Sequence, residues 1–147
     1  MILDTSVIIA VLRREPDRRA FLRAIYASEW RRLSAASYVE AAIVSDRSPD
    51  PFVRSSLDDL LRRLAVVIEP VSVAQARLAR EAHQIFGRGS GHPAALNYGD
   101  CFAYALAKEM GEPLLFKGDD FNKTDIPFVG RREERRRLSE ILAAYGA

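Results

Sequence analysis

Acidic residues follow several of the apolar runs in this sequence. Residues 1–3 lead directly into Asp4, and the run PLLF is followed, after Lys117 and Gly118, by two aspartates. In an open parallel sheet, ligands bind outside the carboxyl ends of the strands, so acids at those ends converge on one edge if the first, second and fourth strands lie near one another. The acids that could form such a site are Asp4, Glu40, Asp100, Asp119 and Asp120.

Carboxylates that lie close together repel one another, so such a cluster requires a compensating cation. Oxygen-only ligands suit Mg²⁺ or Mn²⁺. The chain has two histidines, His83 and His92, and a single cysteine, Cys101, so a zinc site and an internal disulfide are not expected. Cys101 lies in the apolar stretch CFAYALA and is predicted to be a small core residue.

The same acids also have structural interpretations. Ser37 and Glu40 have the spacing of a helix capping box, and Asn97 and Asp100 have a similar spacing. The paired aspartates after Gly118 could be ordinary turn residues. The first aspartate is harder to explain in this way, because the strand before it is apolar enough to be buried along most of its length.

The segments that would position these acids alternate between short apolar strands and helices. Strands are predicted at residues 1–3, 32–35, 66–68, 113–116 and 126–129. Helices are predicted at 6–12, from 15–17 to about 25, from 37, at 51–65, at 72–86 before Gly87, at 97–110 before Gly111, and in the arginine-rich tail. This order predicts one α/β domain over residues 1–147, with a central parallel sheet of about five strands and helices on both faces.

Composition and charge set broad limits. Of the 147 residues, 48% are hydrophobic and 29% charged, and the net charge is +2. Arginine clusters permit a polyanionic partner but also suit solvated helix faces. No apolar run reaches the roughly 18 residues of a membrane span. The apolar start has no basic residue before it and is interrupted by an acid, so a signal peptide is not expected and a cytoplasmic protein is.

Four stretches in order, MILDTS, SAASYVEAA, HPAALNYGDCFAYALA and PLLFKGDDF, resemble the PIN-domain ribonucleases and, more closely, the VapC toxins of bacterial toxin–antitoxin modules. The resemblance covers essentially the whole chain. It implies a three-layer α/β/α sandwich. It also implies that Asp4 matches the aspartate of the first strand, Glu40 the glutamate of the next motif and Asp100 the helix aspartate.

The fourth acid follows the resemblance less closely. Lys117 occupies the place of a threonine in relatives, and Phe121 comes early. Asp119 is chosen as the fourth catalytic and metal-binding residue, with Asp120 as the alternative. Thr5 and Ser6 match hydroxyl residues that support the first aspartate.

The resemblance implies an Mg²⁺-dependent endoribonuclease, with Mn²⁺ as a substitute, that cleaves RNA through a metal-activated water and leaves 5′-phosphate and 3′-hydroxyl ends. Its implied partners are a VapB-like antitoxin, which inhibits it, an RNA substrate and a second copy in a homodimer. Lys117 and Arg88 are the nearest cations in sequence that could contact RNA.

Other functions are also compatible with some of these features. A PIN-like RNA-binding module without activity, or an RNA-processing nuclease outside a toxin–antitoxin system, would share the fold. A receiver domain needs an acidic pair after its first strand, and a haloacid-dehalogenase phosphatase needs D-x-D there. Here Ser6 stands where the second acid of D-x-D would be.

Overall fold

Four short parallel strands form the centre of the computed structural model, which describes residues 1–129. Strand β1 is central and pairs with β2 on one side and β4 on the other, with Ile2 opposite both Arg32 and Leu114. The strand order is β3-β2-β1-β4. The bounds are β1 Ile2–Leu3, β2 Arg32–Ser34, β3 Val67–Glu69 and β4 Leu114–Leu115. The strands predicted to carry the acids are therefore neighbours.

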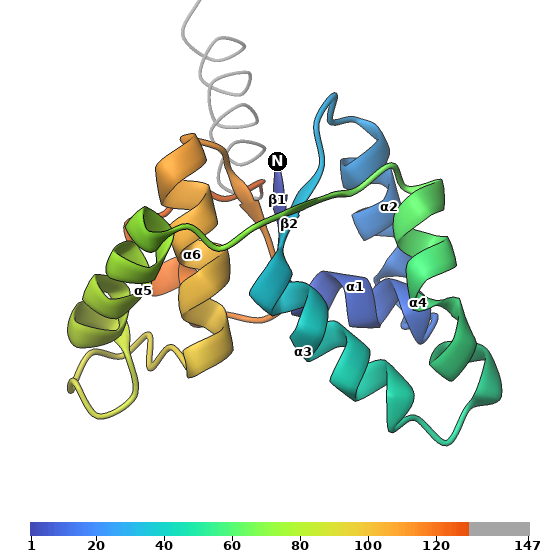
Figure 1. The fold of residues 1–147 in the computed structure, drawn as a ribbon, viewed down its shortest axis with the longest axis horizontal. Helices are drawn as coiled ribbons and strands as arrows, with labels where there is room; N and C mark the ends of the chain where they lie inside the picture. Colours follow the sequence, from blue (N-terminus) through green and yellow to red (C-terminus); the bar gives the residue numbers. More distant parts are fainter. Residues whose placement is uncertain (130–147) are drawn as a thin grey trace, which may run out of the picture.

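Helices cover both faces of the sheet, as Figure 1 shows, with α5 and α6 on one side and α1 to α4 on the other. Their bounds are α1 Thr5–Leu12, α2 Arg18–Tyr26, α3 Ala35–Asp46, α4 Pro51–Arg63, α5 Val73–Phe86 and α6 Tyr98–Met110, followed by a 3₁₀ turn at Asp120–Lys123. The predicted α/β/α layering is confirmed.

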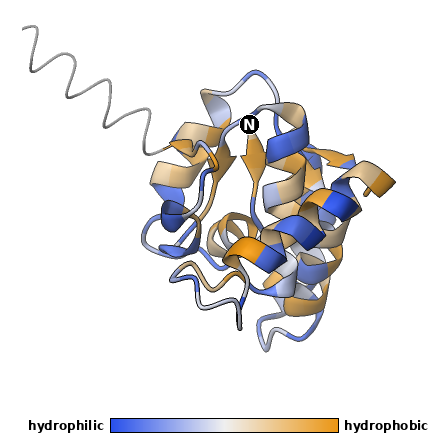
Figure 2. Cartoon of the chain, turned by 90° about the vertical axis from the view of Figure 1, so that its left-hand side faces the viewer, coloured by the Kyte–Doolittle hydropathy of each residue, from blue (hydrophilic) through white to orange (hydrophobic). Residues whose placement is uncertain are grey.

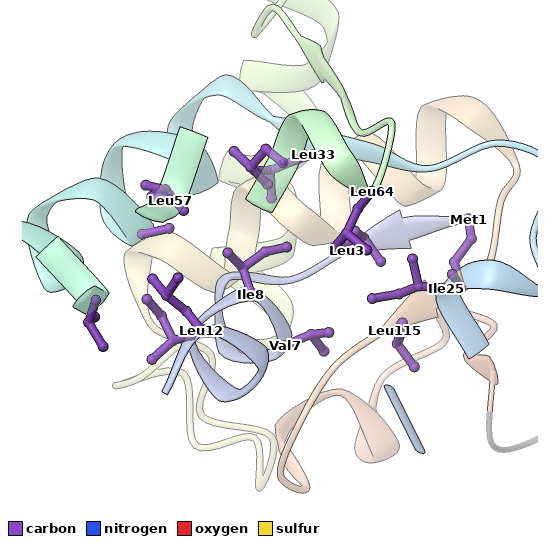
Figure 3. Close-up of a cluster of buried hydrophobic side chains, with 14 residues drawn as sticks. Met1, Leu3, Val7, Ile8, Leu12, Ile25, Leu33, Leu57, Leu64 and Leu115 are labelled. Atoms are coloured by element: carbon purple, nitrogen blue, oxygen red, sulfur yellow. The ribbon is translucent and has the colours of Figure 1, made fainter. Parts of the chain in front are cut away.

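Each face of the sheet has its own hydrophobic core. Successive strand residues point to opposite faces, so Leu3 joins the cluster packed by α1 to α4, whereas Ile2 joins the cluster packed by α5 and α6. In β4, Leu115 likewise packs in the core beside α1 to α4, and Leu114 packs in the core beside α5 and α6. Figure 3 shows the first of these clusters, with Leu3 and Leu115 among the helix side chains. Two independently packed faces hold β1, and hence the residue that follows it, firmly in place.

Helix α3 begins earlier than the capping-box pattern predicts. Its N-cap is Ser34, whose side chain accepts a hydrogen bond from the Ala36 amide at 3.3 Å. Strand β2 pairs with β3 as far as Ser34, and the helix starts at the next residue. The predicted start at Ser37 is therefore wrong, and Glu40 lies in the second turn with no capping role.

The predicted fifth strand is also wrong. Its residues contribute a single isolated bridge, between Leu114 and Phe128, and the Leu114 amide donates to the Pro127 carbonyl at 2.9 Å. The predicted end of α6 at Gly111 is confirmed, since Gly111 adopts the left-handed conformation with φ of 62°. The predicted tail helix lies outside the described residues.

Hydropathy follows this layering. In Figure 2 the strands at the centre are hydrophobic, whereas the outer helices carry both hydrophobic and hydrophilic residues. Cys101 is buried in the α5–α6 core, as predicted. Within residues 1–129, none of the helices combines the length and apolar character needed to cross a bilayer.

Candidate functional site

Asp4 is a buried carboxylate at the junction of β1 and α1. Its side chain is 6% exposed and caps α1, with Oδ2 accepting hydrogen bonds from the Ser6 amide at 3.0 Å and the Ser6 hydroxyl at 2.6 Å. Burial raises the pKa of Asp4, the Ser6 hydrogen bonds oppose that effect, and the charge of Asp120 adds to it. Asp4 is therefore a carboxylate whose ionised form is disfavoured by its burial.

The hydroxyl of Ser6 accepts a hydrogen bond in turn from the segment that follows β4. The Lys117 amide donates to Ser6 Oγ at 2.9 Å, while Lys117 Nζ pairs with Glu15 and, at 3.0 Å, with Asp17. The segment after β4 therefore supports the first aspartate through its backbone. The ammonium of Lys117, expected from the sequence to contact RNA, is shared by two acids between α1 and α2.

Glu40 reaches the same region from α3. Burial raises the pKa of Glu40, a hydrogen bond from Thr5 opposes this, and the charge of Asp4 adds to it. The Thr5 hydroxyl has one proton to donate, either to Glu40 or to the Ser37 carbonyl 3.1 Å away, and both acceptors belong to α3, so Thr5 ties the start of α1 to α3. Of the two hydroxyl residues that follow Asp4, Ser6 supports Asp4 and Thr5 supports Glu40.

Asp100 lies in the first turn of α6, where the predicted capping box is confirmed. Its Oδ2 accepts from the Asn97 amide at 2.9 Å, and the Asp100 amide donates to Asn97 Oδ1 at 2.8 Å. Burial, together with the charges of Asp4, Asp120 and Glu40, raises the pKa of Asp100 to about 7, against the Asn97 hydrogen bond. The structural and functional interpretations of Asp100 are thus compatible.

The charges that act on Asp4 and Asp100 favour one of the two neighbouring aspartates as a fourth member of the group. Asp120, the first residue of the 3₁₀ turn, raises the pKa of both Asp4 and Asp100. Asp119 instead accepts a hydrogen bond from Asn122 at 3.2 Å and does not figure among those charges. We therefore prefer Asp120 to Asp119 as the fourth acid. The group of Asp4, Glu40, Asp100 and Asp120 is called the acid cluster below.

No lysine, arginine or histidine among residues 1–129 forms an ion pair with any member of the acid cluster. The donors are all carboxylate oxygens, which suits a hard divalent cation such as Mg²⁺ or Mn²⁺. Within the same residues, no three His, Cys, Asp or Glu side chains are arranged to hold an ion as they stand. Binding would therefore require these carboxylates to turn toward a common point.

The raised pKa of Asp100 predicts a pH dependence of stability. Because this pKa rises from 3.8 to about 7, the folded protein holds the proton more tightly than the unfolded chain does. The resulting stabilisation is complete below the unfolded value and is lost as the pH rises through about 7. In EDTA, the melting temperature is expected to fall between about pH 4 and about pH 7. Asp100→Asn, which keeps an oxygen for the Asn97 amide, should flatten this slope; an unchanged slope would contradict the assignment.

Comparison with known proteins gives consistent matches over most of the chain. A family model described as "PIN domain" matches residues 1–127. The protein named Ribonuclease VapC28 from Mycobacterium tuberculosis is 55% identical over 126 residues, which cover 86% of this chain and 95% of that protein.

Two solved structures share the fold at low sequence identity. The crystal structure of VapC20 from Mycobacterium tuberculosis, described as a sarcin-ricin loop cleaving toxin, has a TM-score of 0.66 at 15% identity and covers 87% of this chain and 97% of its own. A toxin–antitoxin complex from Klebsiella pneumoniae has a TM-score of 0.61 at 16% identity and covers 82% and 88%.

Proposed function

The chain belongs to the PIN-domain family and, within it, to the VapC ribonucleases, and from this membership we propose that it is a divalent-metal-dependent endoribonuclease whose active site is the acid cluster. The observation that carries the proposal is the grouping of four carboxylates on one edge of the sheet without a protein cation to balance them among the described residues. Such a group would repel an RNA phosphate unless a cation were bound.

Asp4 and Asp100 are the proposed principal ligands, with Glu40 and Asp120 completing the set. A bound Mg²⁺ or Mn²⁺ would supply positive charge against the phosphate and would lower the pKa of a water molecule. Ser6 and Asn97 orient the two principal carboxylates through the hydrogen bonds described above. These bonds engage Oδ2 of each carboxylate, so that the other oxygen of each could turn toward an ion while the partner holds the side chain at the site.

The partners follow from the family as part of the same proposal. We propose that the chain is the toxin of a VapBC module, that a VapB-like antitoxin inhibits it, and that it works in the cytoplasm as a homodimer. The identity of the 55% relative and the fold of the toxin–antitoxin complex support this partner class. Two alternatives, an RNA-binding module without activity and a nuclease outside a toxin–antitoxin module, account less directly than a VapC toxin for the relatives named above.

Metal dependence can be tested by activity and by stability together. Purified protein is expected to cut total RNA into discrete fragments with 5′-phosphate ends in Mg²⁺ or Mn²⁺, and not in EDTA. An ion present at about a hundred times its Kd stabilises the folded state by about 2.7 kcal/mol. For a domain of this size that corresponds to a rise in melting temperature of roughly 5–10 °C.

The two readouts separate the possible outcomes. Stabilisation by Mn²⁺ without cleavage would retain the metal site and move the function toward RNA binding or a narrow substrate. Cleavage that persists in EDTA would contradict the proposed chemistry. Coexpression with an antitoxin encoded beside this chain should suppress the cleavage, and its failure to do so would contradict the toxin–antitoxin assignment.

A further inference from the structure

Gly99 lies in the first turn of α6, between Tyr98 and Asp100. We propose that Gly99 is a positioning residue for Glu40, because the missing side chain at position 99 provides the space that the Glu40 carboxylate occupies. This inference rests on the proposed function for its consequence in catalysis. Its geometric content stands independently of that function.

The space is defined by a close approach. A Cβ atom placed on Gly99 would lie 1.8 Å from Glu40 Oε2 and 2.8 Å from Glu40 Cδ; the third nearest atom, Asn97 Oδ1, would be 3.3 Å away. A separation of 1.8 Å is far inside any non-bonded contact between carbon and oxygen. Any side chain at position 99 would therefore displace the carboxylate of Glu40 from its present position.

Backbone conformation does not explain the glycine. Among residues 1–129, the glycines with positive φ are Gly89, Gly91, Gly111 and Gly118, and Gly99 is not one of them. Inside a helix, glycine is less favourable than alanine by roughly 0.5–1 kcal/mol. The residue is therefore unfavourable for the helix, and its close contact with Glu40 is the feature that accounts for it.

The contact also brings Glu40 to the rest of the acid cluster. Helices α3 and α6 pack against each other, and Glu40 crosses from α3 to the turn that carries Asp100. The first turn of a helix has unpaired amide groups and the positive end of its dipole, which favour a carboxylate there. Gly99 thus lets a third negative charge approach Asp100 at a point where the backbone offsets part of the repulsion.

The displaced group would be the far end of a flexible side chain, so the fold should accommodate Gly99→Ala. We expect this variant to melt at or slightly above the temperature of the wild type, because alanine is the better helix former. Its affinity for Mn²⁺ should fall, and its kcat for RNA cleavage should drop roughly 10- to 100-fold with little change in KM, as expected for a misplaced site group.

Two further variants distinguish positioning from a general effect on α6. Gly111→Ala places a methyl group at the other end of the helix, where φ is +62° and no atom lies within 4 Å. It should lower the melting temperature and leave cleavage by the folded protein unchanged. Glu40→Asp shortens the displaced side chain, so the double variant Gly99→Ala/Glu40→Asp should be no worse than Glu40→Asp alone.

A readout that needs neither RNA nor metal keeps the inference separate from the proposed function. The ¹³Cδ chemical shift of Glu40 should change in Gly99→Ala, because the carboxylate leaves the space beside the first turn of α6. An unchanged ¹³Cδ shift, or additive losses in the double variant, would overturn the inference. A shifted Glu40 signal in a protein whose wild type neither binds Mn²⁺ nor cleaves RNA would instead retain the positioning role and refute the nuclease.

Discussion

RNA cleavage by the Asp4→Asn variant is expected to fall by about a thousandfold or more. An ion that stabilises charge in the transition state lowers the activation free energy by several kcal/mol, and each 1.36 kcal/mol corresponds to a tenfold change in rate. The substitution removes the negative charge and keeps the shape of the side chain. An asparagine oxygen at position 4 can still accept from the Ser6 amide and hydroxyl, and asparagine caps helices as well as aspartate does. The loss should therefore be specific to metal binding.

The stability of the same variant should move in the opposite direction. Burial disfavours the ionised Asp4 carboxylate, and repulsion from Asp120 adds to this, so a neutral side chain relieves both. The melting temperature in EDTA is expected to equal or exceed that of the wild type. The rise in melting temperature on adding Mg²⁺ should disappear.

Asp50→Asn provides the matched control. Asp50 caps α4, and its Oδ1 accepts from the Phe52 amide at 2.9 Å, so the same chemical change is made at an equivalent helix position outside the acid cluster. This variant should cleave RNA at the wild-type rate. Undiminished cleavage by Asp4→Asn, or an equal loss in Asp50→Asn, would refute the assigned role of Asp4.

The sequence predicts the parts of this fold that depend on local pattern. Alternating apolar runs and helical segments indicate the α/β layering, whereas the order of the strands, which brings β1, β2 and β4 together, comes from the structure. Asp4 is identified because it interrupts an apolar segment that is buried on both faces. Asn97 and Asp100 are identified as a capping box because both members lie within one helical turn.

Elements whose position depends on pairing partners could not be located from local pattern. Ser34 and Ser37 each precede residues with a helical pattern, and either serine could cap the helix. Ser34 is the cap because the pairing of β2 with β3 ends there, and β3 lies beyond α3 and α4 in the sequence. Residues 126–129 have the composition of a strand, yet only one bridge to β4 forms.

The contact between Gly99 and Glu40 was also missed from the sequence. A glycine in the first turn of an otherwise alanine-rich helix is an anomaly that the sequence does display. Its partner lies on α3, and only the packing of α3 against α6 identifies it. Sequence reasoning can therefore flag such a glycine but cannot say which side chain occupies the space beside it.

The choice between the two neighbouring aspartates depends on the direction of a turn. Phe121 is 2% exposed and packs against Phe116, with ring centroids 5.0 Å apart, so the start of the 3₁₀ turn is anchored in the α5–α6 core. With Phe121 fixed, the charge of Asp120 raises the pKa of Asp4 and of Asp100, whereas the Asp119 side chain accepts a hydrogen bond from Asn122. Spacing within KGDDF cannot reveal this, because both aspartates lie in the same short turn.

The pair Asp119→Asn and Asp120→Asn therefore forms a test in which each variant is the control for the other. Asp120→Asn is expected to lower cleavage roughly a hundredfold and to weaken Mn²⁺ binding, as the loss of one charged group from a preorganised site does. Asp119→Asn should leave the cleavage rate within about threefold of the wild type, roughly 0.7 kcal/mol in activation free energy, because the Asp119 side chain accepts from Asn122 and its charge does not act on Asp4 or Asp100.

The titration of Asp100 gives an independent measurement of the same assignment. Its pKa of about 7 includes repulsion from Asp120, so Asp120→Asn should lower that pKa toward the ordinary aspartate value, and Asp119→Asn should leave it in place. The ¹³Cγ signal of Asp100 in EDTA reports this without RNA or metal. If Asp119→Asn instead lowered both the cleavage rate and the pKa of Asp100, the fourth acid would be Asp119, and its carboxylate rather than that of Asp120 would act on Asp100 in the metal-free protein.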